Sequence, residues 1–149
     1  MLDYDSLLEK LTARFGPRVQ IMADAKDMLT ITAQPEVLLD LMKELKAKFP
    51  LLADLTGADY QGELEVIYHL MAIPGADKLR VKVRIPEARA ELPSVVSVWP
   101  AAEVQEREVY DLLGIKFIGH PHLVRILCPD DFVGHALRKD FQLVRAERS

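Results

Sequence analysis

The sequence has one cysteine and no long apolar run. Cys128 alone excludes a disulfide within the chain and suits a reducing compartment. There is no Cys-x-x-Cys pair, so we expect no iron–sulfur cluster on this chain. No apolar run reaches the ~18–20 residues that a membrane span needs, and the first residues lack the basic stretch of a secretory signal. These absences favour a soluble cytosolic protein.

An excess of basic residues over acidic ones is also lacking. The formal net charge is -4 and the sequence pI is about 5.6, whereas nucleic-acid binding normally shows a basic excess or stripe. We therefore expect no nucleic-acid partner. Half of the 149 residues are hydrophobic and 28% are charged, which excludes a disordered chain and favours one globular domain.

The apolar pattern of the first 86 residues predicts two helices and five strands. Apolar residues recur at helical spacing over 4–15 and 35–49, and they alternate or cluster as strands over 19–23, 29–33, 51–55, 65–70 and 79–85. Gly57 and Gly62 bracket a predicted turn. The order predicts an α+β fold, a two-layer domain with helices on one face of a mixed β-sheet.

A third helix is predicted over about residues 100–113, ending at Gly114. Glu103, Arg107 and Asp111 are four residues apart and can form a ladder of ion pairs on it. Glu106, Glu108 and Asp111 also supply carboxylates for acid–base chemistry. However, the chain offers no nucleophile–base pair and no glycine-rich phosphate loop. We therefore expect no catalytic residues on this chain.

After Gly114 the sequence keeps its apolar side chains and loses its periodicity. Residues 115–149 are interrupted by Gly119, Pro121, Pro129 and Gly134. Such a segment either covers its own domain or docks on another protein. We divide the chain into a core domain, residues 1–114, and an extended C-terminal arm, residues 115–149.

Four residues of this segment are of the types that bind zinc: His120, His122, Cys128 and His135. Their spacing matches no common structural zinc pattern, and Cys128 follows an apolar run as a small buried residue would. A free-standing metal-binding protein is therefore kept only as an alternative, and we expect no metal.

The same region carries a long motif. Residues 106–121 read EREVYDLLGIKFIGHP, residues 120–127 read HPHLVRIL, and residues 134–141 read GHALRKDF after Pro129-Asp130-Asp131. This run resembles the signature of the C-subunit family of NADH-quinone oxidoreductase, respiratory complex I. Ala136 departs from the family pattern, which usually has proline there.

The resemblance implies a non-catalytic peripheral-arm subunit of a proton-translocating NADH-quinone oxidoreductase. Such a subunit would scaffold the hydrogenase-like large subunit near the quinone site, on the cytoplasmic side of the cell membrane. It would touch the membrane only through the complex. Quinone, iron–sulfur clusters, FMN and NADH would all belong to partner subunits. The alternative is an equivalent subunit of a membrane-bound hydrogenase or of a dehydrogenase with another electron donor.

Carried onto this sequence, the resemblance implies partner contacts along the motif. The expected interface residues are Glu106, Arg107, Glu108, Asp111, Gly114, His120, Pro121, Arg125, Asp130, Asp131, Gly134, His135, Arg138, Lys139 and Asp140. Arg125 and Arg138 suit bidentate contacts with carboxylates.

Overall fold

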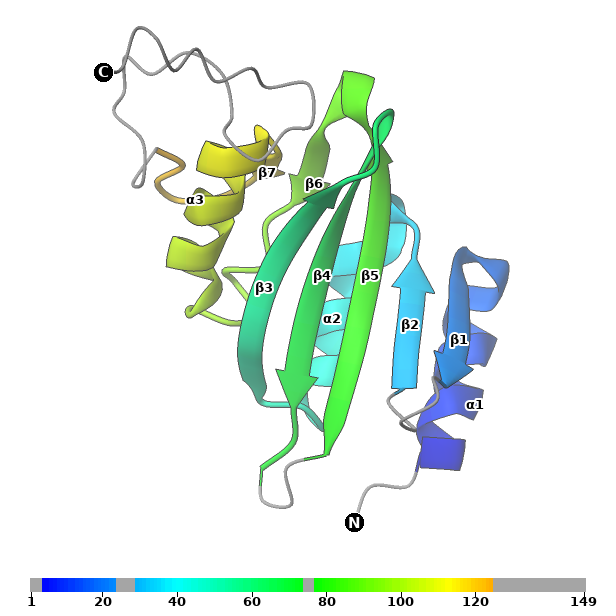
Figure 1. The fold of residues 1–149 in the computed structure, drawn as a ribbon. Coiled ribbons are helices and arrows are strands. Elements are labelled where there is room, and N and C mark those ends of the chain that lie inside the picture. Colours follow the sequence, from blue (N-terminus) through cyan, green and yellow to red (C-terminus); the bar gives the residue numbers. More distant parts are fainter. Residues whose placement is uncertain (1–3, 24–28, 74–76, 125–149) are drawn as a thin grey trace, which may run out of the picture.

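The computed structural model describes residues 4–23, 29–73 and 77–124 (Figure 1). Within these ranges the chain forms a five-stranded sheet, a short two-stranded sheet and three α-helices. The prediction of an α+β fold is confirmed. The predicted arm beyond residue 124 lies outside the described residues.

The first two helices follow the apolar spacing of the sequence. Helix α1 (Tyr4–Phe15) buries Leu7, Leu11 and Phe15. Helix α2 (Leu38–Lys46) follows a short 3-10 turn, η2 (Pro35–Val37), so it begins three residues later than predicted. Proline at the start of that turn loses no hydrogen bond, because the first N–H of a helix has no partner within it.

The large sheet is mixed, with the strand order β1-β2-β5-β4-β3. Its strands are β1 (Val19–Ala23), β2 (Leu29–Ala33), β3 (Leu51–Asp59), β4 (Glu63–Met71) and β5 (Lys78–Pro86). Strands β2 and β5 pair in parallel, and the other neighbours pair antiparallel. The chain crosses from β2 through α2 to the far edge strand β3 and returns to β5.

One face of this sheet forms the core. Leu79, Val81, Val83 and Ile85 of β5 are at most 1% exposed, and they alternate with charged residues on the other face. Figure 1 shows α2 behind the sheet, and α3 (Ala102–Leu113) contacts β3 at Gly57 on the same, apolar face. The predicted arrangement of helices on one face of a mixed sheet is thus observed.

The turn between β3 and β4 is shorter than predicted. Strand β3 continues through Gly57, where a side chain would collide with Leu113, and ends at Asp59. The Asp59 carboxylate accepts the Gln61 N–H at 2.8 Å, and Gln61 (φ 55) and Gly62 (φ 108) take left-handed backbone conformations. Glycine at position 57 therefore serves helix packing rather than a bend.

Two short strands were not predicted. Strands β6 (Glu91–Pro93) and β7 (Lys116–Ile118) pair in parallel. Ile115 and Phe117 are buried in the core. Within the described residues, β7 therefore packs with the core, although it follows the boundary expected at residue 114.

Candidate partner-docking site

The motif residues begin on α3, and the helix geometry fixes where they point. Gly114 ends the helix in a left-handed conformation (φ 78, ψ 17), and its N–H donates to the Tyr110 carbonyl at 2.8 Å. Gly119 (φ 88) turns the chain again directly after β7. A positive φ is readily adopted by glycine, which has no β-carbon.

Glu106 points into the protein. It is 0% exposed and accepts hydrogen bonds from the Ser94 hydroxyl (2.6 Å) and from the Val95 N–H (2.8 Å). Burial raises the pKa of Glu106, while the two hydrogen bonds and His120 oppose that rise. Burial, and secondarily Glu106, raises the pKa of Tyr68. Glu106 therefore anchors α3 to the segment that follows β6.

Arg107 and His120 join the turn after β7 to α3. The Arg107 guanidinium lies 3.4 Å from the Glu103 carboxylate and donates to the Val124 carbonyl at 3.2 Å. The His120 Nδ1 atom accepts the His122 N–H at 2.9 Å. Its Nε2 atom therefore carries the proton and donates to the Glu103 carbonyl at 2.9 Å.

The surface around the hydrogen bond between Arg107 and Val124 carries both apolar and charged side chains. Val104 on α3 is 47% exposed and Val124 is 38% exposed, beside the half-buried Arg107. We call Val104, Arg107 and Val124 the α3 patch. Along the sequence, Val124 directly precedes the remaining motif residues.

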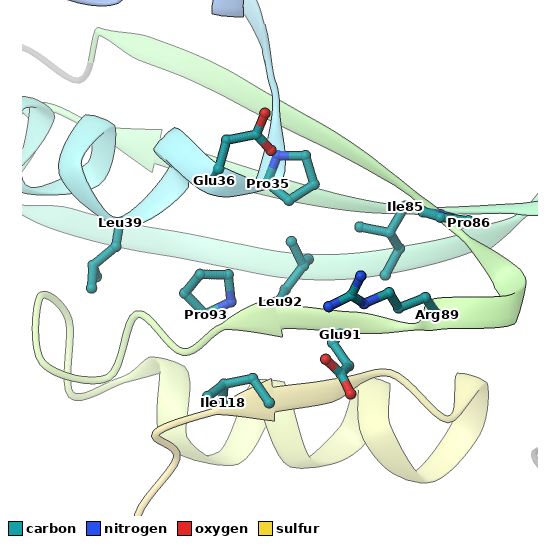
Figure 2. A pocket seen from close by; sticks show the side chains of 10 residues that line it. All are labelled: Pro35, Glu36, Leu39, Ile85, Pro86, Arg89, Glu91, Leu92, Pro93 and Ile118. Atoms are coloured by element: carbon teal, nitrogen blue, oxygen red, sulfur yellow. The ribbon is translucent and has the colours of Figure 1, made fainter.

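A groove lies on another side of β7, between the two sheets (Figure 2). It has a volume of about 680 Å³, and Leu39, Ile85 and Leu92 line it among its apolar residues. Its lining residues are Pro35, Glu36, Leu39, Ile85, Pro86, Arg89, Glu91, Leu92, Pro93 and Ile118. None of these is a histidine, a cysteine or a hydroxyl residue, and the charged residues among them are Glu36, Arg89 and Glu91.

The structure separates the predicted interface residues into three groups. Arg107, Glu108, Gly114, His120 and Pro121 are partly or fully exposed. Glu106 and Asp111 are 0% exposed, so their side chains act within the chain. The predicted Glu103–Arg107 ion pair is confirmed. Arg125, Asp130, Asp131, Gly134, His135, Arg138, Lys139 and Asp140 lie outside the described residues.

Sequence reasoning missed Ser94 and Val95, the partners of Glu106. They lie in an irregular segment without periodicity, so no pattern in the sequence marks them. A buried carboxylate needs donors from elsewhere in the chain, and only the fold reveals which residues supply them.

The described part of the chain has neither a metal-binding cluster nor a membrane-spanning helix. Within residues 4–23, 29–73 and 77–124, no three His, Cys, Asp or Glu residues are grouped so as to hold a metal ion. No helix in these ranges is long and apolar enough to cross a membrane. Cys128 and His135 of the alternative metal site lie outside the described residues.

Comparison with protein families gives the assignment. The family described as "Respiratory-chain NADH dehydrogenase, 30 Kd subunit" matches residues 31–147, a span that includes α3, β7 and the whole motif. The chain belongs to this family. The predicted membership of the C-subunit family of complex I is thereby confirmed.

Curated relatives match almost the entire chain. The C subunit of NADH-quinone oxidoreductase from Moorella thermoacetica is 48% identical over 143 residues, which cover 93% of this chain and 95% of the relative. The corresponding subunit from Citrifermentans bemidjiense is 39% identical, and the match covers 99% of this chain and 95% of the relative.

Two solved structures share the fold. The trypsin-resistant fragment (1-134) of Nqo5 has a TM-score of 0.71 and 34% identity, covering 80% of this chain and 98% of the fragment. A chain of the membrane-bound sulfane sulfur reductase, an archaeal respiratory membrane complex, has a TM-score of 0.82 and 26% identity. That match covers 97% of this chain and 89% of the other. The family is thus one of respiratory-complex subunits.

Proposed function

We propose that this chain is a non-catalytic scaffolding subunit of a proton-translocating NADH-quinone oxidoreductase. Its role is to hold the hydrogenase-like large subunit near the quinone site, through the α3 patch and the motif residues that follow. The iron–sulfur subunits are further partners. Quinone, FMN, NADH and the clusters belong to those subunits, and the chain stays on the cytoplasmic side of the membrane.

One observation carries the proposal. The family motif begins at a surface on α3, where Arg107 donates to the carbonyl of the exposed Val124 and lies beside the exposed Val104. Exposed apolar side chains beside a charged group are typical of the buried centre and rim of a protein interface. Beneath this surface the buried Glu106 of the motif ties α3 to Ser94 and Val95.

The proposed contact is tested by introducing a charged residue into the α3 patch. Val104→Glu is expected to reduce strongly the amount of this chain that co-purifies with a tagged membrane subunit, because a carboxylate would be desolvated at the contact. Ile73→Glu is the matched control, since Ile73 is 61% exposed and lies beyond the end of β4. Equal recovery of both variants would contradict the proposed contact.

The second candidate function rests on the archaeal structure. Because a sulfane sulfur reductase chain shares the fold over 97% of this sequence, the fold serves complexes of different electron chemistry. Mass spectrometry of the purified complex separates the candidates. A flavoprotein subunit that binds NADH supports the first, and a complex without one supports another electron donor.

A further inference from the structure

Strand β1 forms one outer edge of the large sheet (Figure 1). We propose that this edge binds an extended polypeptide segment of a neighbouring subunit, which pairs with the backbone of Ile21 and adds a strand to the sheet. This inference rests on the proposed function, because it requires that the chain work within a complex. It uses a different surface from the α3 patch, and it depends on backbone hydrogen bonds rather than on side-chain contacts.

The pairing of β1 with β2 decides which backbone groups face outward. The Arg18 carbonyl accepts the Gln34 N–H at 3.0 Å, so these residues form a hydrogen-bonded pair directly before the ladder. Hydrogen-bonded and non-hydrogen-bonded pairs alternate along antiparallel strands, and the register is continuous to Ala23. Ile21 stands opposite Ile31 as a non-hydrogen-bonded pair, so the N–H and the carbonyl of Ile21 point away from β2.

The same alternation places further backbone groups on the outer edge. The Val19 carbonyl and the Ala23 N–H point outward with the two groups of Ile21. The Val19 N–H is already used, because it donates to the Gly16 carbonyl. Within the described part of the chain, no turn, helix or side chain forms a hydrogen bond with the Ile21 backbone. Such a row of donors and acceptors is complementary to the backbone of another strand.

Strand β1 has none of the features that protect sheet edges. Its sequence is VQIMA, without charge, proline or glycine, and its register with β2 has no bulge. Sheets commonly block an exposed edge with charged side chains, proline, a bulge or a covering element. An edge without these features is suited to pairing with another chain.

The opposite edge strand, β3, is protected. A bulge interrupts its register between Leu52 and Asp54. The Asp54 carboxylate accepts the Leu55 N–H at 2.9 Å, so this N–H is not offered to another strand. Helix α3 packs against β3 at Gly57. The difference between the two edges makes β1 the one that suits a partner strand.

The side chains of β1 indicate what the added strand carries. Ile21 is half-buried and packs against the core, whereas Gln20 and Met22 lie on the other face and are exposed. Directly opposite residues in neighbouring strands share a face. The partner residue beside Ile21 is therefore apolar, because it extends the apolar layer on the helix side of the sheet.

The size of the edge favours a neighbouring subunit over a second copy of this chain. Five residues at ~3.3 Å each make an edge roughly 17 Å long, which at ~10 Å of thickness covers roughly 170 Å². A standard interface buries about 800 Å² per partner. Two copies held by this edge alone would not form a stable dimer, whereas a segment of a subunit that is also bound elsewhere can pair here.

Hydrogen exchange of single amides in the intact complex tests the pairing. In the free chain, the Ile21 N–H is expected to exchange faster than those of Gln20 and Met22, which are bonded to β2. In the complex, its exchange is expected to be slower by about tenfold or more. Equal exchange of Ile21 in both forms, or an Ile21 N–H already protected in the free chain, would overturn the inference.

Photo-cross-linking in the complex identifies the occupant. Benzoylphenylalanine at position 20 or 22 lies on one face of β1, so both probes are expected to link to one segment of another subunit, at residues about two apart. Ile21→Pro is expected to lower both yields several-fold, because proline has no N–H, while the ladder with β2 loses no hydrogen bond. Ile21→Val is the matched control that keeps the N–H, and its yields should be unchanged.

Urea unfolding of the free chain checks that Ile21→Pro is folded, and the exchange measurement decides if it is not. Equal yields from folded Ile21→Pro and Ile21→Val would overturn the inference. So would links to a second copy of this chain, to lipid, to nucleic acid or to two unrelated segments, or no link. If the chain is present in the complex under those results, the proposed function stands. If the chain is absent, both fail.

Discussion

Glu106 illustrates how one residue can serve the fold while belonging to a functional motif. Its carboxylate is fully buried and accepts hydrogen bonds from both the Ser94 hydroxyl and the Val95 N–H. Because α3 carries the half-buried Arg107 one residue later, the position of the α3 patch depends on this internal anchor. A loss of assembly on mutating Glu106 would therefore report a misplaced helix rather than a lost contact.

We predict that Glu106→Ala strongly destabilises the chain. The substitution leaves two buried donors without an acceptor, at about 1–3 kcal/mol each, so we expect a loss of about 2–4 kcal/mol in the free energy of unfolding. Glu106→Gln keeps an amide oxygen in place and should lose less than half as much. Urea denaturation of both variants measures this, and equal losses would contradict the role of the acceptor oxygens.

The pKa of Glu106 predicts a pH dependence of stability. Burial raises this pKa above the ordinary value of 4.5, so the folded chain binds the proton more tightly than the unfolded chain. The resulting stabilisation is complete below the unfolded pKa and disappears as pH rises through the folded one. The stability of the native chain relative to Glu106→Gln should therefore fall as pH rises above 4.5. Urea midpoints measured from acidic to mildly alkaline pH would show it, and a constant difference would contradict it.

At the scale of helices and strands, the close contact between α3 and β3 depends on glycine at position 57. A β-carbon at position 57 would meet the Leu113 side chain closely and would lie 3.3 Å from Val109 Cγ1. Glycine therefore lets the helix approach the edge strand. This packing holds the helix that carries the α3 patch against the sheet.

We predict that Gly57→Ala destabilises the chain by about 1–3 kcal/mol through overpacking. Leu113→Ala alone should cost about 2–5 kcal/mol, because it opens a cavity. In the double variant the new methyl group occupies part of that cavity, so the combined loss should be smaller than the sum by about 0.5–3 kcal/mol. Thermal or urea unfolding of the four proteins tests this, and additive losses would show that the two positions do not touch.

For the molecule as a whole, the sheet separates two kinds of surface. Its apolar face packs on the helices, while its charged face carries the cations of β5. Helix α3, which carries Val104 and Arg107 of the α3 patch, contacts the edge strand β3.

The topology also predicts which backbone amides are most protected. Strand β5 is paired on both sides, with β2 and β4, whereas β1 is an edge strand of five residues. Amide hydrogen exchange should therefore be slowest in residues 79–85 and much faster in 19–23, because opening β5 requires breaking two ladders. Mass spectrometry of exchanged peptides measures this, and equal protection of both peptides would contradict the central place of β5.

Local patterns in the sequence were enough to predict the main elements and the family. Helical spacing places α1, alternation places β4 and β5, and the motif from Glu106 to Pro121 predicts the family that the comparison confirms. Each of these features depends on a repeat or a run of residues along one segment, so it can be read without knowing the fold.

Other features follow only from contacts between remote parts of the chain. The parallel pairing of β2 with β5, the three-residue strands β6 and β7, and the buried position of Glu106 all depend on such partners. Three residues are too few to show a period, and the burial of a carboxylate depends on which donors the fold brings to it. The ion pair between Arg84 and the buried Glu65 has the same origin, because only the pairing of β4 with β5 places these two residues side by side.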